Sequence, residues 1–140
     1  MRNVLISFSN LQDVNLRNVD MSGSKAHYTN FSFSVMEGMN LSKVRADYAN
    51  FSFSFMDDST KLDDLRMVWA IGDGTRIRTF QINRYHVVTD GVSLAIGWDQ
   101  YPVDRWLRFN DEDIFNIGGD VMLEWWKNYK DLVIQLTSIK

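Results

Sequence analysis

The most informative part of this chain is a segment that occurs twice, as KAHYTNFSFSVM at residues 25–36 and as RADYANFSFSFM at residues 45–56. The two copies align without a gap at an offset of 20 residues, and a shorter period of five residues runs within each. An apolar residue occupies every fifth position, preceded mostly by Asn or Asp and, one position earlier, mostly by a small residue. The apolar series is Ile6, Leu11, Leu16, Met21, Ala26, Phe31, Met36, Leu41, Ala46, Phe51 and Met56. Helices repeat their apolar residues about every 3.6 positions and strands every second one, so neither element explains the pattern.

This pattern of a small residue, Asn or Asp, an apolar residue and two variable residues resembles that of the pentapeptide-repeat family over about residues 4–58. The resemblance implies a short right-handed quadrilateral β-helix with four pentapeptides in each coil, so that the 20-residue offset is one full turn. In that fold the apolar residue and the small residue two positions before it point inward, and the other three point outward. Successive coils are then expected to pair like parallel strands, about 4.8 Å apart.

The pattern stops after Met56, because Lys61 occupies the position where the next apolar residue is expected. We therefore predict fewer than three coils, within a domain of residues 1–60. A solenoid this short depends on a cap or a partner to cover its ends. Residues 61–140 are expected to form a second segment that packs on the coils or caps them.

Adding 20 to an outward position gives the residue stacked on it, and this rule predicts three apolar columns on the outside of the coils. They are Phe8–Tyr28–Tyr48, Phe33–Phe53 and Val35–Phe55. Exposed apolar clusters on soluble proteins mark interfaces, and a ring with a hydroxyl suits a half-apolar surface. The candidate residues for contact with a partner are therefore Tyr28, Phe33, Tyr48, Phe53 and Phe55. For Phe33, Val35, Phe53 and Phe55 the sequence favours the alternative that the chain's own C-terminal segment packs there, whereas the Tyr28–Tyr48 column suits either role.

The pattern of residues in the C-terminal part predicts a small β-meander of four antiparallel strands, followed by α-helices. The chain as a whole is therefore expected to be mainly β. Turn residues at 72–75 and 90–91 separate two strand pairs, and the expected strands are 67–71, 76–82, 85–88 and 92–98. A short helix is expected at 102–108, with Pro102 near its first turn. Asn110 should cap the next short helix, Gly118 and Gly119 should end it, and Asp120 should cap a longer helix that ends near Ser138.

The helical part contributes two further groups of candidate residues. Asp111, Glu112 and Asp113 form a small acidic patch, although the helix dipole also explains acids in the first turn of a helix. Trp125 and Trp126 belong to the apolar stripe of the last helix and are expected in the core, with one ring partly exposed. Either of these rings could contact a partner or close a homodimer.

Composition argues against several kinds of function. The chain has 15 basic and 18 acidic residues and a net charge of −3, which disfavours direct binding to nucleic acid. It has no cysteine and only two histidines, so neither a metal nor a cofactor is expected. The serines fill positions of the repeat, and we find no catalytic set. No apolar run is long enough for a signal peptide or a membrane helix, so we expect a cytoplasmic protein without membrane association.

Four segments characterise the C-terminal half: RYHVV at 84–88, IGWDQYPVDRW at 96–106, FNDEDI at 109–114 and LEWWKNYK at 123–130. They resemble the same part of small pentapeptide-repeat proteins of tailed bacteriophages and prophages. This resemblance implies a phage-encoded, non-enzymatic protein in the cytoplasm of a bacterial host. The leading hypothesis is a module that binds a host protein and inhibits or redirects it, with a defence nuclease or another DNA-handling enzyme as the partner.

Three alternatives stay open. The chain could be a homo-oligomeric scaffold, or a mimic of duplex DNA that binds a type II topoisomerase, as relatives in the family do. Residues 1–60 hold five basic and six acidic residues, however, so the coils would form a nearly neutral rod. The third alternative is an enzyme or a binder of a small nucleotide signal. Its site would lie in the C-terminal half or between subunits, because side chains fill the coils.

Overall fold

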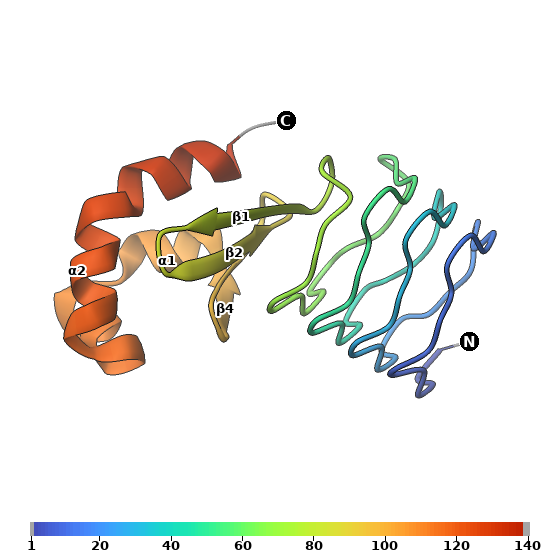
Figure 1. The fold of residues 1–140 in the computed structure, drawn as a ribbon, viewed down its shortest axis with the longest axis horizontal. Coiled ribbons are helices and arrows are strands. Elements are labelled where there is room, and N and C mark those ends of the chain that lie inside the picture. The colour runs from blue at the N-terminus through green and yellow to red at the C-terminus, as the bar shows by residue number, and fades with distance from the viewer. Residues whose placement is uncertain (1, 139–140) are drawn as a thin grey trace.

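The computed structural model describes residues 2–138, and Figure 1 shows them as two parts placed end to end. The N-terminal part, coloured blue to green, is a stack of coils. The C-terminal part, which we name the cap, is a small sheet with helices on the side away from the coils. None of the helices in the described residues is long and apolar enough to cross a membrane.

Parallel bridges between residues one turn apart hold the coils together. They join Leu5 to Lys25, and then every fifth residue to its counterpart 20 positions later, up to Val35 and Phe55. Backbone hydrogen bonds flank each bridge, such as Ile6 N to Lys25 O at 2.8 Å and Lys25 N to Val4 O at 2.9 Å. Each five-residue unit thus contributes one bridge and one turn. The period of five in the sequence is therefore the period of the backbone.

The inside of the stack is filled by the apolar series and by the small residues between its members. Phe31 and Phe51 are fully buried and stack with their ring centroids 5.0 Å apart. The buried hydroxyls of Thr29 and Ser34 donate to backbone carbonyls of the preceding coil, which satisfies them without water. The residues at positions 29 and 34 must be small because the buried rings of Phe31 and Phe51 already occupy most of the interior beside them.

The coils continue beyond the predicted boundary at residue 60, and the prediction that they end after Met56 is wrong. Further bridges join Asn40 to Lys61, Arg45 to Arg66 and Asn50 to Ile71, at an offset of 21 instead of 20 residues. One extra residue in the turn at 57–60 shifts the register by one position. Leu62 and Met67 consequently take the inward apolar positions and are buried, whereas Lys61 is at a bridge position and exposed.

Beyond the coils the chain forms a four-stranded antiparallel sheet in the order β1-β2-β3-β4, as the sequence predicts in strand number and direction. The strands are β1 (Arg78–Ile82), β2 (Tyr85–Thr89), β3 (Ser93–Ile96) and β4 (Asp99–Pro102). The predicted strand at 67–71 is wrong, because these residues belong to the last coil. β4 is not predicted from the sequence, which assigns Pro102 to a helix instead. This edge strand tolerates Pro102, since an edge residue without an N–H interrupts no ladder.

The sheet lies between the end of the coils and the helices. Because side chains alternate along a strand, Val88 and Ala95 pack into the core of the coils, whereas Val87 and Ile96 pack with the helices. The C-terminal part therefore caps one end of the stack and does not lie along its sides, as Figure 1 also shows.

Several polar side chains fasten the cap to the coils, and Gln100 and Arg76 make two contacts each. Gln100 of β4 accepts a hydrogen bond from Met67 N at 2.8 Å and donates one to Leu65 O at 2.7 Å. Arg76 donates to the backbone carbonyls of Asp57 and Thr60, in the turn that holds the extra residue. Both side chains thereby satisfy backbone groups of the last coil that no further coil reaches.

Two helices follow the sheet, α1 (Val103–Arg108) and α2 (Asp111–Thr137). As predicted, Asn110 caps the second helix, because its side chain accepts from Asp113 N while the Asp113 carboxylate accepts from Asn110 N. Gly118 and Gly119 leave the helical conformation, so α2 is kinked where the sequence predicts a break. The core between sheet and helices is rich in tryptophan, with Trp106, Trp125 and Trp126.

Candidate functional site

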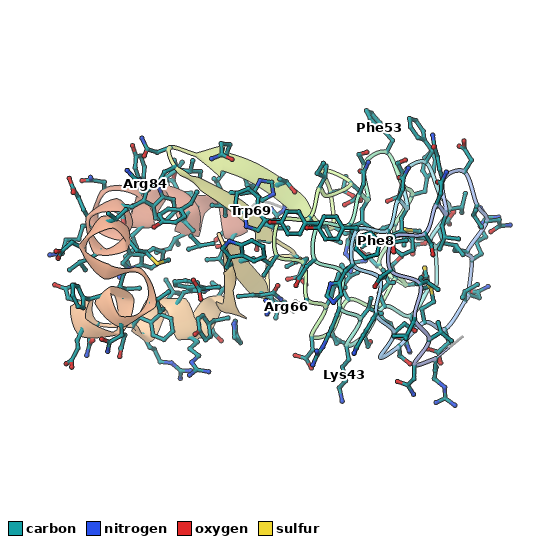
Figure 2. All side chains as sticks on the ribbon, turned by 60° about the horizontal axis from the view of Figure 1, so that its bottom comes forward. Phe8, Lys43, Phe53, Arg66, Trp69 and Arg84 are labelled. Atoms are coloured by element: carbon teal, nitrogen blue, oxygen red, sulfur yellow. The ribbon has the colours of Figure 1, made fainter. Side chains whose placement is uncertain are left out.

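The most distinctive surface of the molecule is a row of stacked rings along the side of the coils, labelled at Phe8 and Trp69 in Figure 2. This aromatic row consists of Phe8, Tyr28, Tyr48, Trp69 and His86. Successive ring centroids are 5.1, 4.6, 6.0 and 4.8 Å apart. Neighbouring planes among the first four rings differ by 6° or less. The row therefore runs from the first coil across the junction to β2 of the cap.

The row follows from the register of the coils. Phe8, Tyr28, Tyr48 and Trp69 each stand two residues after an inward apolar residue, and their φ angles are positive, between 58° and 65°. A residue with a Cβ adopts this left-handed conformation at a cost of about 1–2 kcal/mol, which glycine avoids. The other units mostly have residues that such a position favours, and the full set is Asn3, Asp13, Asn18, Gly23, Gly38, Lys43 and Asp64.

Trp98, in the turn between β3 and β4, lies against the aromatic row from outside. Its ring centroid is 5.4 Å from that of Tyr48 at 61°, and 6.2 Å from that of Trp69 at 57°. Beside Trp98, toward the first coil, lies a shallow groove of about 350 Å³. It is lined by Ser7, Phe8, His27, Tyr28, Asp47, Tyr48 and Trp98. Phe8 and Trp98 expose 77% and 59% of their surface, so the groove offers accessible apolar surface.

One side of the groove is a polar column of Ser7, His27 and Asp47, which are the residue types of a catalytic triad. Ser7 Oγ accepts a hydrogen bond from the backbone N of His27 at 3.1 Å, and His27 Nδ1 accepts one from the backbone N of Asp47 at 3.2 Å. Asp47 Oδ2 lies 3.0 Å from Arg66 Nε, with which it forms an ion pair. In a triad the hydroxyl bonds to the imidazole, and within residues 2–138 no such bond joins Ser7 to His27. The column therefore has a structural explanation.

A second group of exposed rings lies elsewhere around the coils, near Phe53 in Figure 2. Phe33 and Phe53 stack with their centroids 5.0 Å apart, and Phe55 stands two residues further. These three residues expose 48%, 69% and 64% of their surface. The interpretation that the chain's own C-terminal segment packs against them is wrong, because that segment covers the end of the coils instead.

The acidic candidates lie on the helices, away from the rings on the coils. Asp111, Glu112 and Asp113 form the first turn of α2, and Asp113 belongs to the helix cap. Asp111 Oδ2 is 3.4 Å from Lys127 Nζ in an exposed ion pair. The helix dipole and the cap account for these residues, and a role for them in partner binding stays a prediction.

Trp125 and Trp126 are buried in the core between the sheet and the helices, with 3% and 4% of their surface exposed. Trp125 also donates from Nε1 to Ile82 O at 2.9 Å. The prediction that these two rings form a partner surface is therefore wrong. The apolar stripe on which they lie is the core-facing side of α2.

Three residues of the aromatic surface are not predicted from the sequence: Trp69, His86 and Trp98. Adding 20 to Tyr48 leads to Val68, which is buried, because the extra residue at 57–60 moves the column to Trp69. The resumed series of Leu62 and Met67 is a signal that would have revealed this shift. His86 and Trp98 come from the sheet, and no period connects them to the coils.

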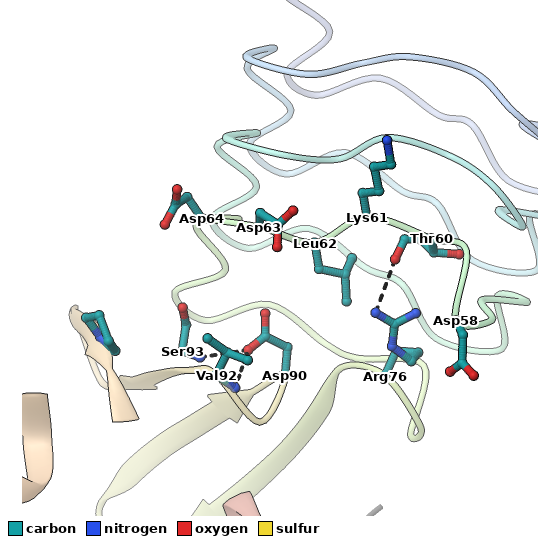
Figure 3. Close-up of a pocket in the computed structure, with 11 residues that line it drawn as sticks. Asp58, Thr60, Lys61, Leu62, Asp63, Asp64, Arg76, Asp90, Val92 and Ser93 are labelled. Atoms are coloured by element: carbon teal, nitrogen blue, oxygen red, sulfur yellow. Dashed lines mark hydrogen bonds between the residues drawn. The ribbon is translucent and has the colours of Figure 1, made fainter. Parts of the chain in front are cut away.

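A second hollow lies where the cap meets the coils, and Figure 3 shows it in close-up. Its volume is about 460 Å³, and its charged lining residues are Asp58, Lys61, Asp63, Asp64, Arg76 and Asp90. Burial raises the pKa of Asp90, whose carboxylate accepts from the backbone N of Val92 and of Ser93. No three or more His, Cys, Asp or Glu residues in the described chain are grouped so that they could hold a metal ion.

Comparison with known proteins agrees with the period of the backbone. Residues 1–38 match the family model for pentapeptide repeats, in eight copies. No curated protein matches the chain. The N-terminal part therefore contains pentapeptide repeats, and proteins with such repeats are in general non-enzymatic. The bridges extend the same period to Ile71, well past the matched residues.

Proposed function

We propose that this chain is a non-enzymatic module that binds a partner protein through the rings on the outside of its coils. The observation that carries the proposal is the presence of aromatic residues at positive φ, namely Phe8, Tyr28, Phe33, Tyr48, Phe53 and Trp69. Left-handed backbone favours Gly, Asn and Asp, so the rings stand where the backbone disfavours them. The turn of each unit imposes this conformation, as at Asp13 and Lys43, so the backbone does not explain why these units hold rings.

Stability is a weaker explanation for these rings than contact with a partner. A stacked pair of rings contributes about 0.5–1.5 kcal/mol, whereas left-handed backbone costs each residue about 1–2 kcal/mol. The two contributions roughly cancel, and the rings also leave apolar surface in water. Within residues 2–138, the buried Nε1 of Trp69 has no hydrogen-bond partner, which costs further free energy. Exposed apolar surface of this kind is typical of protein interfaces.

The fold proposed for the coils suits this role. We infer that they form the right-handed quadrilateral β-helix that the family resemblance implies, and the four bridges in each 20-residue turn support four sides. Such a helix presents rigid outer faces, on which side chains one turn apart keep a fixed spacing. A partner would therefore meet a preorganised surface, which lowers the entropy cost of binding.

The charges on the coils favour this proposal over a mimic of duplex DNA that binds a topoisomerase. Three carboxylates lie within 3.6 Å of a guanidinium: Asp20 beside Arg2, Glu37 beside Arg17 and Asp47 beside Arg66. A decoy of DNA needs a continuous negative field along its length, and paired charges cancel that field.

The partner that we propose is a host protein such as a defence nuclease or another DNA-handling enzyme, which a phage-encoded protein would inhibit or redirect. This identity depends on the resemblance of the C-terminal half to phage proteins and stays a prediction. The alternative of a homo-oligomeric scaffold loses support, because Trp125 and Trp126, which could have closed a dimer, are buried.

A capture experiment tests the binding role. Tagged wild-type protein and the variant Tyr28→Asn/Phe33→Asn/Phe53→Asn are incubated with bacterial lysate and cross-linked. Asn suits left-handed backbone, so the variant should fold. The matched control is Phe115→Ala, because Phe115 of α2 exposes 47% of its surface, close to the 48% of Phe33. We expect a protein that the wild type and the control retain and the triple variant loses. Equal retention by all three, or retention by none, contradicts the proposal.

A further inference from the structure

We propose that the groove beside Trp98 binds an aromatic side chain of the partner protein, with its ring laid flat against the edges of Tyr28 and Phe8. This inference rests on the binding role proposed above and specifies the chemistry of the partner. It concerns the aromatic row alone and not the exposed Phe33–Phe53 pair.

The packing of Trp98 against the aromatic row shows that this surface accommodates an aromatic side chain. Trp98 comes from a two-residue turn and lies across the aromatic row, tilted by 61° to Tyr48 and by 57° to Trp69. The groove continues the same row over the next two coils, where Tyr28 and Phe8 have the same backbone conformation as Tyr48 and Trp69. The open part of the row thus repeats the surface on which a tryptophan already lies.

The charge distribution of stacked rings is the second argument. Phe8, Tyr28 and Tyr48 are nearly parallel, so their faces cover one another and their edges are turned to the groove. The edge of an aromatic ring is partially positive and its face partially negative. A ring laid flat on these edges therefore gains an attraction that an aliphatic side chain of similar size lacks.

His27, on the polar side of the groove, supplies a hydrogen-bond donor for the backbone of the partner segment that inserts the ring. His27 Nδ1 accepts from the backbone N of Asp47, so the neutral imidazole carries its hydrogen on Nε2. That N–H can donate to a carbonyl of the incoming segment. The volume of about 350 Å³ lies near the lower end of the range for small ligands, which suits one side chain with its own backbone.

The test is an NMR titration of the full chain with N-acetyl-L-tryptophanamide, compared with N-acetyl-L-leucinamide. We expect ring-current shifts of Phe8, Tyr28 and Trp98 signals with the tryptophan compound, and an affinity at least about fivefold higher than that for the leucine compound. Tyr28→Asn should lower the affinity for the tryptophan compound by a similar factor. Phe53→Asn, at the equivalent position outside the groove, should leave it unchanged.

Three results would overturn the inference: no shift in the groove with the tryptophan compound, equal affinity for both compounds, or equal affinity of wild type and Tyr28→Asn. Capture of the partner separates such a failure from a failure of the binding role. If Tyr28→Asn still captures the partner that the triple variant loses, the binding role stands and this inference falls. If the tryptophan compound binds as expected but no variant changes capture, the groove is confirmed and the binding role falls.

Discussion

The coils place most of their aromatic residues outside, whereas the cap buries every tryptophan but Trp98 between sheet and helices. On the coils, Phe8, Phe33 and Phe53 stand outside on left-handed backbone, with about half or more of their surface exposed. In the cap, Trp106 is fully buried between sheet and helices, and its Nε1 donates to Leu94 O at 2.8 Å. The difference shows that backbone register, rather than residue type, decides whether a ring is buried in a core or exposed on the surface.

The physical reason lies in the two interiors. The coils enclose a space of fixed cross-section, and the inward series of large and small residues already fills it, so any further ring must stand outside. The cap has an open layer between sheet and helices, which closes around whatever apolar side chains the helices bring. Removing rings should therefore have large effects in both interiors and small effects on the outside of the coils.

The largest effect is expected for a charge placed inside the coils. Phe51→Asp puts an unpaired carboxylate into the closed interior and should destabilise the fold by at least about 3–5 kcal/mol, enough to unfold the array. Phe53→Asp, only two residues away, should stay folded, because Phe53 is outside and Asp13 and Asp64 show that Asp accepts the same positive φ. Circular dichroism during thermal unfolding distinguishes the two. Similar stability of both variants would show that the assignment of inside and outside is wrong.

The next effect concerns the core of the cap. Trp106→Ala removes a fully buried indole and its hydrogen bond, and should lower the free energy of unfolding by about 3–5 kcal/mol. Trp98→Ala, which removes an indole that is 59% exposed, should lower it by about 1 kcal/mol or less. Urea denaturation followed by far-ultraviolet dichroism measures both. A loss for Trp98→Ala larger than about 1 kcal/mol would mean that the contact between Trp98 and the aromatic row stabilises the junction between cap and coils.

A smaller, pH-dependent effect is expected at the junction between the two regions. Burial raises the pKa of Asp90 in the folded protein above its ordinary value of 3.8, so the folded state binds this proton more tightly than the unfolded state. Stability therefore falls as the pH rises from 3.8 through the folded pKa, and is lowest above it. Asp90→Asn keeps the acceptor for Val92 N and Ser93 N without the charge.

Asp90→Asn should consequently be more stable than the wild type at neutral pH and equally stable below pH 3.8. Melting temperatures across a pH series measure the difference. Asp63→Asn, which lines the same hollow on an exposed turn, is the control for the change in net charge. A variant that is less stable at neutral pH would show that the Asp90 carboxylate has a favourable partner in the fold.

The coils could be predicted residue by residue up to Met56, because the period of five is imposed by the backbone and each unit repeats the same steric demand. The extra residue at 57–60 escaped prediction, since a single insertion leaves no trace in composition and places Lys61 where an apolar residue is expected. Without that shift, residues 67–71, which contain Met67, Trp69 and Ile71, have the pattern of a strand. The register of Leu62 and Met67 was the only local signal of the shift.

The candidate binding surface can be predicted in part for the same reason. Tyr28, Tyr48, Phe33 and Phe53 follow from the 20-residue offset alone. The groove, by contrast, needs Trp98, which reaches the aromatic row only after the cap has folded onto the last coil. No pattern in the sequence links a turn between β3 and β4 to Tyr48, and this contact depends on tertiary packing. The burial of Trp125 and Trp126 likewise depends on how α2 docks on the sheet.

The central claim is that the outer rings are present for binding and not for stability. The most direct measurement is the free energy of unfolding of Tyr28→Asn/Phe33→Asn/Phe53→Asn, compared with the wild type by urea denaturation. We predict a difference of no more than about 1 kcal/mol, because relief of left-handed strain offsets the lost stacking. A loss of more than about 3 kcal/mol, well beyond that balance, would show that the rings hold the coils together and would contradict the claim.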